Sequence, residues 1–287
     1  MPLSIKSYKT PLRYPGGKSR ACKKMEPFFP DLRNYDVYYE PFLGGGSVAL
    51  HITKKYPKLK IYVNDLYEPL YNFWVQLQTN GDYVHSQLQQ LKSTYPDRNS
   101  ARELFEDAKE KLYDSDVTDE DRAVYFYVIN KCSFSGLTES SSFSEQASDA
   151  NFSMRGIDKL PVYTKLIRNW RITNFNYGNF INEILWFRNR KYFIYLDPPY
   201  DIKDNLYGRK GSMHKKFDHD KFAKDCEIYN SDMLISYNSE QLIKNRFKDW
   251  NCAEFDLTYT MRSVGEYMRN QKSRKELLLF NYNTGVF

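Results

Sequence analysis

The chain has 287 residues, of which 41% are hydrophobic and 27% are charged, a composition that excludes collagen-like and disordered chains. No apolar run approaches the roughly 18 residues that a membrane-spanning helix needs, so an integral membrane protein is excluded. The formal net charge of +6 suits a polyanionic partner, although a solvated basic surface explains it equally well.

The four cysteines and four histidines are scattered, with no CxxC pair and no spacing typical of a metal site. We therefore expect reduced thiols and no metal. The first residues, MPLSIKSYKT, lack the apolar core of a signal peptide. These observations favour a cytoplasmic protein that does not contact a membrane.

Seven short β-rich runs predict seven strands. In chain order they are Val37–Glu40, Ile61–Asn64, Arg171–Tyr177, Tyr192–Leu196, Met233–Tyr237, Cys252–Thr260 and Leu277–Tyr282. Helical patterns such as 47–55 and 218–228 lie between most of them, which indicates an α/β fold with a mostly parallel sheet. A polar segment separates the last two runs, so we expect these to be antiparallel.

About a hundred residues separate the second and third runs, far more than the dozen or so of an ordinary crossover. This interval predicts an inserted subdomain at residues 73–170, between a first part at 1–72 and a second at 171–287. The segments NFWVQLQ, SARELFEDAKEKLYD and DEDRAVYFYVIN predict helices. Residues 132–154 are rich in serine and predict a long loop or hairpin.

The carboxyl ends of the predicted strands carry a set of polar and glycine-rich segments. Ligands of open α/β sheets bind at this edge. After the first strand, Gly44, Gly46 and Ala49 match a glycine-rich turn that lets a ligand approach the backbone at a helix N-terminus. Asp65 follows Gly46 by 19 residues at the end of the next strand, where an acid accepts hydrogen bonds from ribose hydroxyls. The pair predicts a nucleoside-containing cofactor, either NAD or S-adenosylmethionine.

The segment IYLDPPY at 194–200 ends a strand in a stiff corner, because proline lacks a backbone donor and restricts φ. Asp197 and the carbonyl of Pro198 offer two acceptors to a planar amino group, and the Tyr200 ring offers a face for stacking. Accepting both N–H bonds favours a pyramidal nitrogen whose lone pair attacks an electrophile. A bare strand terminator is the competing interpretation, and the coincidence with Asp65 argues against it.

These motifs occur in the order found in one known family. The chain resembles the Dam-type (D12 class, alpha group) DNA adenine-N6 methyltransferases through LRYPGGK at 12–18, EPFLGGGSV at 40–48, ND at 64–65 and DPPY at 197–200. The resemblance implies a Rossmann-like fold for S-adenosylmethionine-dependent methyl transfer, with residues 73–170 as a mainly helical target-recognition subdomain. It also implies S-adenosylmethionine as cofactor, without a metal, and double-stranded DNA as partner.

The resemblance assigns roles to individual residues. Asp197, Pro198 and Tyr200 are the expected catalytic residues, and Asp197 also borders the cofactor. Asn179 stands where the family commonly has Asp, and its amide oxygen still accepts a hydrogen bond from the cofactor's adenine. The expected cofactor-binding residues are Tyr14, Lys18, Glu40, Phe42, Gly44, Gly46, Asp65, Asn179 and Phe180. The alternatives to cofactor binding are that Lys18 is a surface lysine and that Phe180 is a core residue.

Candidate DNA contacts follow from the same comparison and from charge. An adenine inside a duplex has to flip out to be methylated. Arg13 adjoins the PGGK motif, Arg155 and Lys159 lie in the family-like segment NFSMRGIDKLP, and Lys210 lies in the basic loop 201–216. After Gly136-Leu137 the chain continues TESSSFSEQ, where members that read GATC tend to have a basic residue. The sequence therefore leaves two alternatives for the DNA site that is recognised, GATC or another sequence.

Other functions remain as alternatives to site-specific adenine methylation. They are a methyltransferase for RNA or a protein amide group, an NAD-dependent oxidoreductase, and a DNA-binding protein without turnover. A cognate restriction endonuclease is a candidate partner, and a monomer or weak dimer is the expected state.

Overall fold

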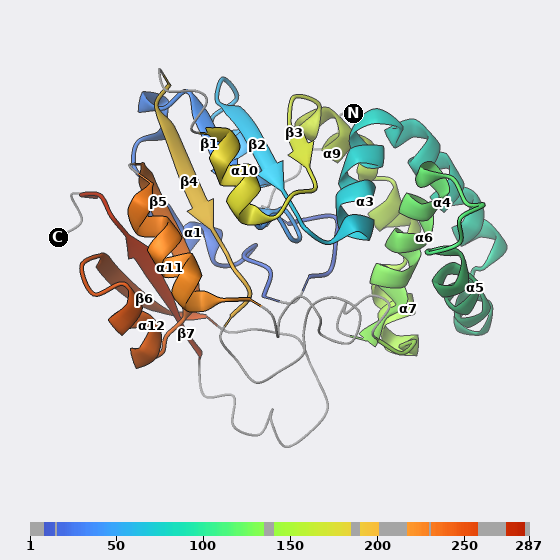
Figure 1. Ribbon diagram of the computed structural model, residues 1–287. Coiled ribbons are helices and arrows are strands. Elements are labelled where there is room, and N and C mark those ends of the chain that lie inside the picture. The colour runs from blue at the N-terminus through green and yellow to red at the C-terminus, as the bar shows by residue number, and fades with distance from the viewer. Residues whose placement is uncertain are drawn as a thin grey trace.

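The computed structural model describes residues 9–14, 16–134, 141–184, 190–200, 217–229, 231–257 and 274–284. Their strands form one seven-stranded sheet in the order β3-β2-β1-β4-β5-β7-β6 (Figure 1). The strands are β1 (Val37–Glu40), β2 (Lys60–Asn64), β3 (Arg171–Thr173), β4 (Tyr192–Leu196), β5 (Asp232–Asn238), β6 (Asn251–Leu257) and β7 (Arg274–Phe280). All seven predicted strands are confirmed, with shifted bounds for five of them.

The strands from β3 to β5 are parallel, whereas β7 runs antiparallel to both β5 and β6. The predicted antiparallel pair at the end of the chain is thus confirmed. Because β7 is reversed, its first residues lie at the sheet edge where the parallel strands end. Glu276, for example, pairs with Asn238, the last residue of β5.

Helices cover both faces of the sheet, as the continuous burial of its central strands requires. In β4, Phe193 and Tyr195 belong to one buried cluster, and Ile194 and Leu196 belong to the other. The second cluster includes side chains of α10 (Tyr177–Ile184), α11 (His219–Ile228) and α12 (Gln241–Arg246). The first includes side chains of α1 (Cys22–Met25) and α2 (Ser47–Lys55) and extends into the insert. Short 3₁₀ turns at Glu26–Phe28 and Leu32–Asn34 precede β1.

The inserted segment is mainly helical, as predicted. Its helices are α3 (Glu68–Thr79), α4 (Gly81–Thr94), α5 (Arg98–Lys111), α6 (Asp119–Cys132), α7 (Glu145–Asn151), α8 (Met154–Ile157) and α9 (Leu160–Ile167). They lie together beside the β3 end of the sheet (Figure 1). The proposed boundary at residue 73 falls inside α3.

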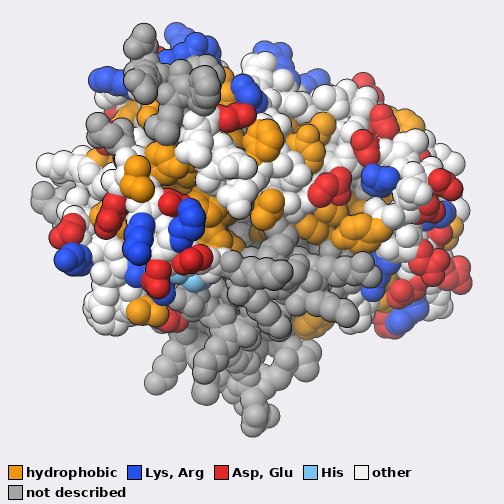
Figure 2. Space-filling view, viewed as in Figure 1, with side chains coloured by type: hydrophobic (Ala, Val, Ile, Leu, Met, Phe, Trp, Pro, Cys, Tyr) orange, Lys and Arg blue, Asp and Glu red, His pale blue; other side chains and the backbone are white. Residues whose placement is uncertain are grey.

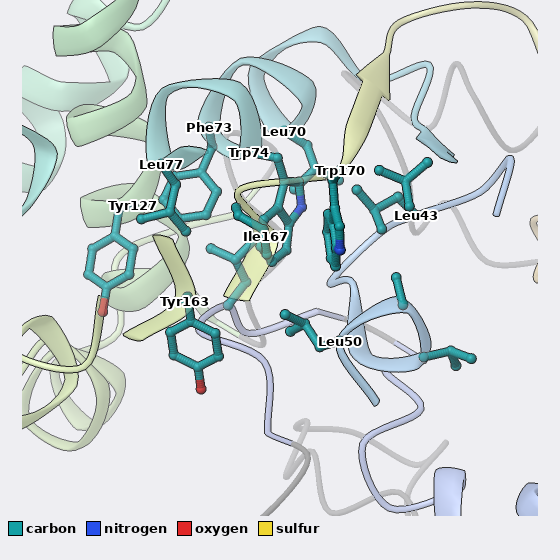
Figure 3. Packing of buried hydrophobic residues seen from close by; sticks show 14 of the residues in the cluster. Leu43, Leu50, Leu70, Phe73, Trp74, Leu77, Tyr127, Tyr163, Ile167 and Trp170 are labelled. Carbon is teal, nitrogen blue, oxygen red and sulfur yellow. The ribbon is translucent and has the colours of Figure 1, made fainter. Parts of the chain in front are cut away.

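Aromatic side chains join the insert to the sheet domain in one continuous core. Trp74 of α3 packs against Trp170, which precedes β3, with ring centroids 5.7 Å apart. The indole of Trp170 donates to Thr53 Oγ1 of α2 at 2.8 Å. Figure 3 shows Leu50 of α2 on the same side of this cluster as Trp170, while Phe73 and Leu77 lie toward Tyr127. The insert is therefore packed on the sheet domain through apolar area, not tethered by a loop alone.

The prediction of a loop or hairpin over residues 132–154 is confirmed at its start and wrong at its end. Ser133 and Phe143 form an antiparallel bridge, as in a hairpin. Residues 145–151 instead form α7, because the Ser144 side chain caps the helix by accepting from the amide of Ala147, and Ala147 and Ser148 are buried. The first three residues of TESSSFSEQ, 138–140, lie outside the described residues.

Within the described ranges, each helix falls short of the length and apolarity required to cross a bilayer. In the same part of the chain, His, Cys, Asp and Glu side chains form no group of three or more that is placed to hold a metal ion.

Candidate active site

The predicted polar segments come together at the carboxyl edge of the sheet. Glu40 ends β1, Asn64 ends β2 and Asp197 follows β4 directly. Glu40 is buried, and the hydroxyl of Tyr38 donates to its Oε2 at 2.6 Å. Desolvation in this buried position raises the pKa of Glu40 well above its ordinary value.

The glycine-rich turn is held tightly between aromatic rings. Gly44 and Gly46 have φ of +50° and +68°, a region that residues with a Cβ rarely adopt. A Cβ on Gly44 would lie 2.8 Å from the Tyr14 ring, and one on Gly46 would lie 2.8 Å from the Trp74 ring. The glycines therefore let the Tyr14 and Trp74 rings pack directly on the turn that precedes α2.

Asp65 is bonded directly to this turn. Its Oδ2 accepts from the amide of Gly44 at 2.7 Å, and its Oδ1 accepts from the amide of Tyr67 at 2.9 Å. Burial raises the pKa of Asp65 to about 6, although both amide hydrogen bonds oppose this. Each carboxylate oxygen has a second lone pair, so Asp65 retains acceptor capacity for a hydroxyl.

Asp197 receives three hydrogen bonds from side chains. Lys18 Nζ lies 2.8 Å from both of its carboxylate oxygens, and Ser236 Oγ donates to Oδ1 at 2.9 Å. Ser236, in the middle of β5, is also 2.8 Å from the hydroxyl of Tyr195. Burial raises the pKa of Asp197, with the Lys18 charge acting in the opposite direction. Lys18 is itself only 3% exposed, so the surface-lysine alternative is wrong.

Tyr200 is fixed from two sides. Its hydroxyl donates to Glu276 Oε1, and its ring packs against Tyr237 with centroids 5.9 Å apart. Lys18 Nζ lies over the Tyr200 ring, 4.9 Å from the centroid, and 3.3 Å from Glu276 Oε1. This part of the site thus consists of one buried cation, Lys18, the two carboxylates of Asp197 and Glu276, and the ring of Tyr200.

Comparison with known sequences assigns this arrangement to a family. The model of the D12 class N6 adenine-specific DNA methyltransferases matches residues 14–261. The chain belongs to this family. It is an adenine-specific DNA methyltransferase with a Rossmann-like α/β fold, as the sequence motifs predicted.

Two curated relatives are methyltransferases by name. The chain is 24% identical to the type II methyltransferase M.MjaIII of Methanocaldococcus jannaschii, over 94% of this chain and 98% of the relative. It is also 24% identical to the modification methylase StsI of Streptococcus sanguinis, over 99% of this chain but only 44% of that protein. The methyltransferase thus spans nearly the whole length of the first relative and less than half of the second.

Two residues missed by the sequence analysis belong to the site of this methyltransferase, Ser236 and Glu276. Both lie in apolar strands, at MLISY and ELLLF, and both are buried. A polar residue inside such a run was the available signal, because burial of a polar side chain requires a partner. Position in the sequence gave no indication of what that partner is.

The remaining predicted cofactor residues of the methyltransferase occupy the β3 side of the edge. Phe42 is half-buried between Tyr177 and Phe217, at centroid distances of 5.6 and 5.8 Å. Asn179 is exposed in the first turn of α10. Phe180 is 1% exposed and packs against Tyr39, so the core alternative describes its position in this structure.

The candidate DNA contacts of the methyltransferase differ in their surroundings. The guanidinium of Arg13 donates to two backbone carbonyls of the insert, those of Lys131 and Ser133. Arg155 is exposed on α8, and Lys159, partly exposed, immediately precedes α9. Lys210 and the whole basic loop 201–216 lie outside the described residues.

Proposed function

We propose that this methyltransferase uses S-adenosylmethionine to methylate N6 of an adenine that is flipped out of duplex DNA at a specific site. The observation that carries the proposal is that Asp197, directly after β4, and the Tyr200 ring both contact the Lys18 ammonium and so border the same space. The family supports the adenine-specific reaction on DNA. The cofactor, the flipped base and the residue roles are our proposals.

The residues at the glycine-rich turn fit a nucleoside with an attached amino acid. Asp65 is a buried acceptor for ribose hydroxyls, and it lies beside the glycine-rich turn that precedes α2. Tyr14 and Glu40 flank the same turn and would border the methionine part. When bound, S-adenosylmethionine supplies an electrophilic methyl group on a positively charged sulfur. Phe42 and Asn179 would border the adenine.

Asp197 is placed to act on the nucleophile. Its carboxylate and the Pro198 carbonyl accept the two N–H bonds of the adenine amino group, which turns the nitrogen lone pair toward the methyl donor. The N–C bond forms as the S–C bond breaks, and the nitrogen then loses one proton. Asp197 and Ser236 are already hydrogen-bonded before substrate arrives, so the carboxylate itself is oriented in advance. Tyr200 supplies the stacking surface for the ring.

Charge on the insert indicates which side would meet DNA. Figure 2 shows acidic side chains gathered over the α5 and α6 side of the insert. The segment between α5 and the first turn of α6 carries five acidic residues that would repel phosphates, Asp114, Asp116, Asp119, Glu120 and Asp121. Arg155 and Lys159 lie elsewhere on the insert, at α8 and α9, and are proposed to contact DNA. The names of the two relatives support a further proposal, that a restriction endonuclease of the same site accompanies the enzyme.

The test is methylation of a random-sequence duplex library with S-adenosylmethionine carrying a labelled methyl group, followed by sequencing of the modified positions. We expect label on N6 of adenine within one short motif. Matched reactions contain the Asp197→Ala variant, or the same library as RNA. Label spread over all adenines would contradict site specificity, and label on RNA but not on DNA would contradict the proposed substrate.

A further inference from the structure

The ammonium of Lys18 occupies the place that the proposed mechanism gives to the adenine amino group. It lies 2.8 Å from both oxygens of Asp197 and over the face of the Tyr200 ring. An amino group that donates to Asp197 and a ring that stacks on Tyr200 would overlap with it. Lys18 therefore has to leave Asp197 before a base can bind there.

A displaced ammonium needs another carboxylate, because Lys18 is buried and an unpaired charge in such a place is strongly destabilising. Glu276 Oε1 lies 3.3 Å from Nζ, so a small movement of the side chain completes the exchange. Glu276 is itself buried, and its position on the reversed strand β7 brings it to the catalytic edge. When Asp197 accepts hydrogen bonds from the substrate, the charge of Lys18 is still balanced by Glu276.

Glu276 has a second contact that suits this role. Its Oε1 also accepts from the Tyr200 hydroxyl, so the same oxygen borders both the ring that would stack on the base and the cation that has to move. The hydrogen bond from Tyr200 and the ion pair with Lys18 hold the carboxylate in place during the exchange.

We infer that Glu276 is a positioning residue that takes over the Lys18 ammonium and thereby frees Asp197 for the adenine amino group. This inference rests on the proposed function. Neither the predicted motifs nor the family description assigns a role to Glu276. It acts through Lys18 and Tyr200, and it does not need to touch the substrate.

The test compares Glu276→Gln with the wild-type enzyme in single-turnover methylation of the duplex found by sequencing. The Gln side chain keeps an oxygen that accepts from Tyr200 but removes the charge that attracts Lys18. We expect the rate to fall roughly ten- to hundredfold, the range of a hydrogen bond to a charged group. Dissociation constants for S-adenosylmethionine and for DNA should change by less than about threefold. Glu254→Gln, on the neighbouring strand β6 and paired with Lys244, is the matched control and should retain the wild-type rate.

A double-mutant cycle separates this role from simple support of the fold. With Lys18→Met there is no ammonium to relocate, so Lys18→Met with Glu276→Gln should be no slower than Lys18→Met alone. The inference would be overturned if the rate loss of the double variant equalled the product of the two single-variant losses. A wild-type rate for Glu276→Gln would also overturn it. If Glu276→Gln does not fold, Glu276→Asp keeps the charge at a shorter reach and should show a smaller loss with the same dependence on Lys18. Absence of methylation by the wild-type enzyme would instead count against the proposed function.

Discussion

Arg13 is joined to Ser133 by a hydrogen bond of 2.6 Å from the guanidinium Nη1 to the backbone carbonyl. Asn130 strengthens the same junction, since its side chain bonds both the amide and the carbonyl of Arg13, at 2.9 and 2.6 Å. Ser133 is the first residue of the bridge that closes the hairpin in the insert. The segment that carries Tyr14 and Lys18 is thus attached to the insert beside the Ser133–Phe143 bridge.

Replacement of Arg13 by Met should loosen this attachment. The Ser133 carbonyl would lose its donor, and we expect a loss of about 1–3 kcal/mol in the free energy of unfolding, measured with urea. Methylation at the recognition site should fall more than methylation at single-base variants of it. Arg20→Met, at an exposed position, is the control. Should Arg13→Met weaken binding equally to all sequences and reduce the salt dependence, Arg13 contacts DNA directly at a phosphate and the prediction is wrong.

Replacement of Asp197 by Asn should separate catalysis from cofactor binding. The amide keeps the shape of the carboxylate but loses its charge and one acceptor, so we expect the rate of methyl transfer to fall by at least about a hundredfold. Binding of S-adenosylmethionine, measured by calorimetry, should weaken only a few-fold. Near-normal turnover in this variant would remove Asp197 from the mechanism.

Cofactor affinity should rise with pH across the titration of Asp65. Burial raises the pKa of Asp65 from 3.8 to about 6 in the ligand-free protein, and only the ionised form has full acceptor capacity for the ribose. Calorimetry at pH 5 should therefore give weaker binding than at pH 7.5. Asp65→Asn should bind weakly at both pH values, and a wild-type pH dependence in that variant would exclude Asp65 as its source.

The same pKa sets a trend in stability. At pH values between the pKa of Asp65 in the unfolded chain and its higher pKa in the folded protein, the folded protein binds more protons at Asp65 than the unfolded chain does. The contribution of this group is therefore present below pH 3.8 and is lost as pH rises through about 6. The difference in melting temperature between the wild-type protein and Asp65→Asn should follow this course.

Lys131 should make the ligand-free protein less stable at neutral pH. Burial and then the nearby charge of Arg13 lower its pKa from 10.5 to about 7. At pH values between these two pKa values, the unfolded chain binds more protons at Lys131 than the folded protein does. The contribution of Lys131 to the free energy of unfolding therefore rises with pH from 7 toward 10. Lys131→Met should remove this rise and gain at least about 1 kcal/mol at pH 7. Lys165→Met, exposed on α9, is the control, and equal effects of both variants in urea unfolding would contradict the prediction.

Local sequence patterns predicted the strands well where burial alternates or is continuous. The runs at 37–40 and 192–196 coincide with β1 and β4. The third run was predicted to reach Tyr177, yet β3 ends at Thr173. The cause is a long-range contact, because the Asn64 side chain bonds both the amide and the carbonyl of Phe175 and draws the chain out of the sheet. The helix α7 was missed because its polar sequence gives no apolar periodicity.

By itself, the sequence determined the order of the motifs, the parallel α/β sheet, the glycine-rich turn with Asp65 and the corner at Asp197. These depend on residue types at short spacing, which local sterics and hydrogen bonding constrain directly. Tertiary structure alone decided that Lys18 lies between Asp197 and Glu276. It also decided that the Arg13 guanidinium donates to backbone carbonyls of the insert. The residues in these contacts are far apart on the chain, by 118 positions for Arg13 and Lys131 and by 179 for Lys18 and Asp197. The contacts arise because the reversed strand β7 and the packed insert bring buried charges to partners that no local pattern specifies.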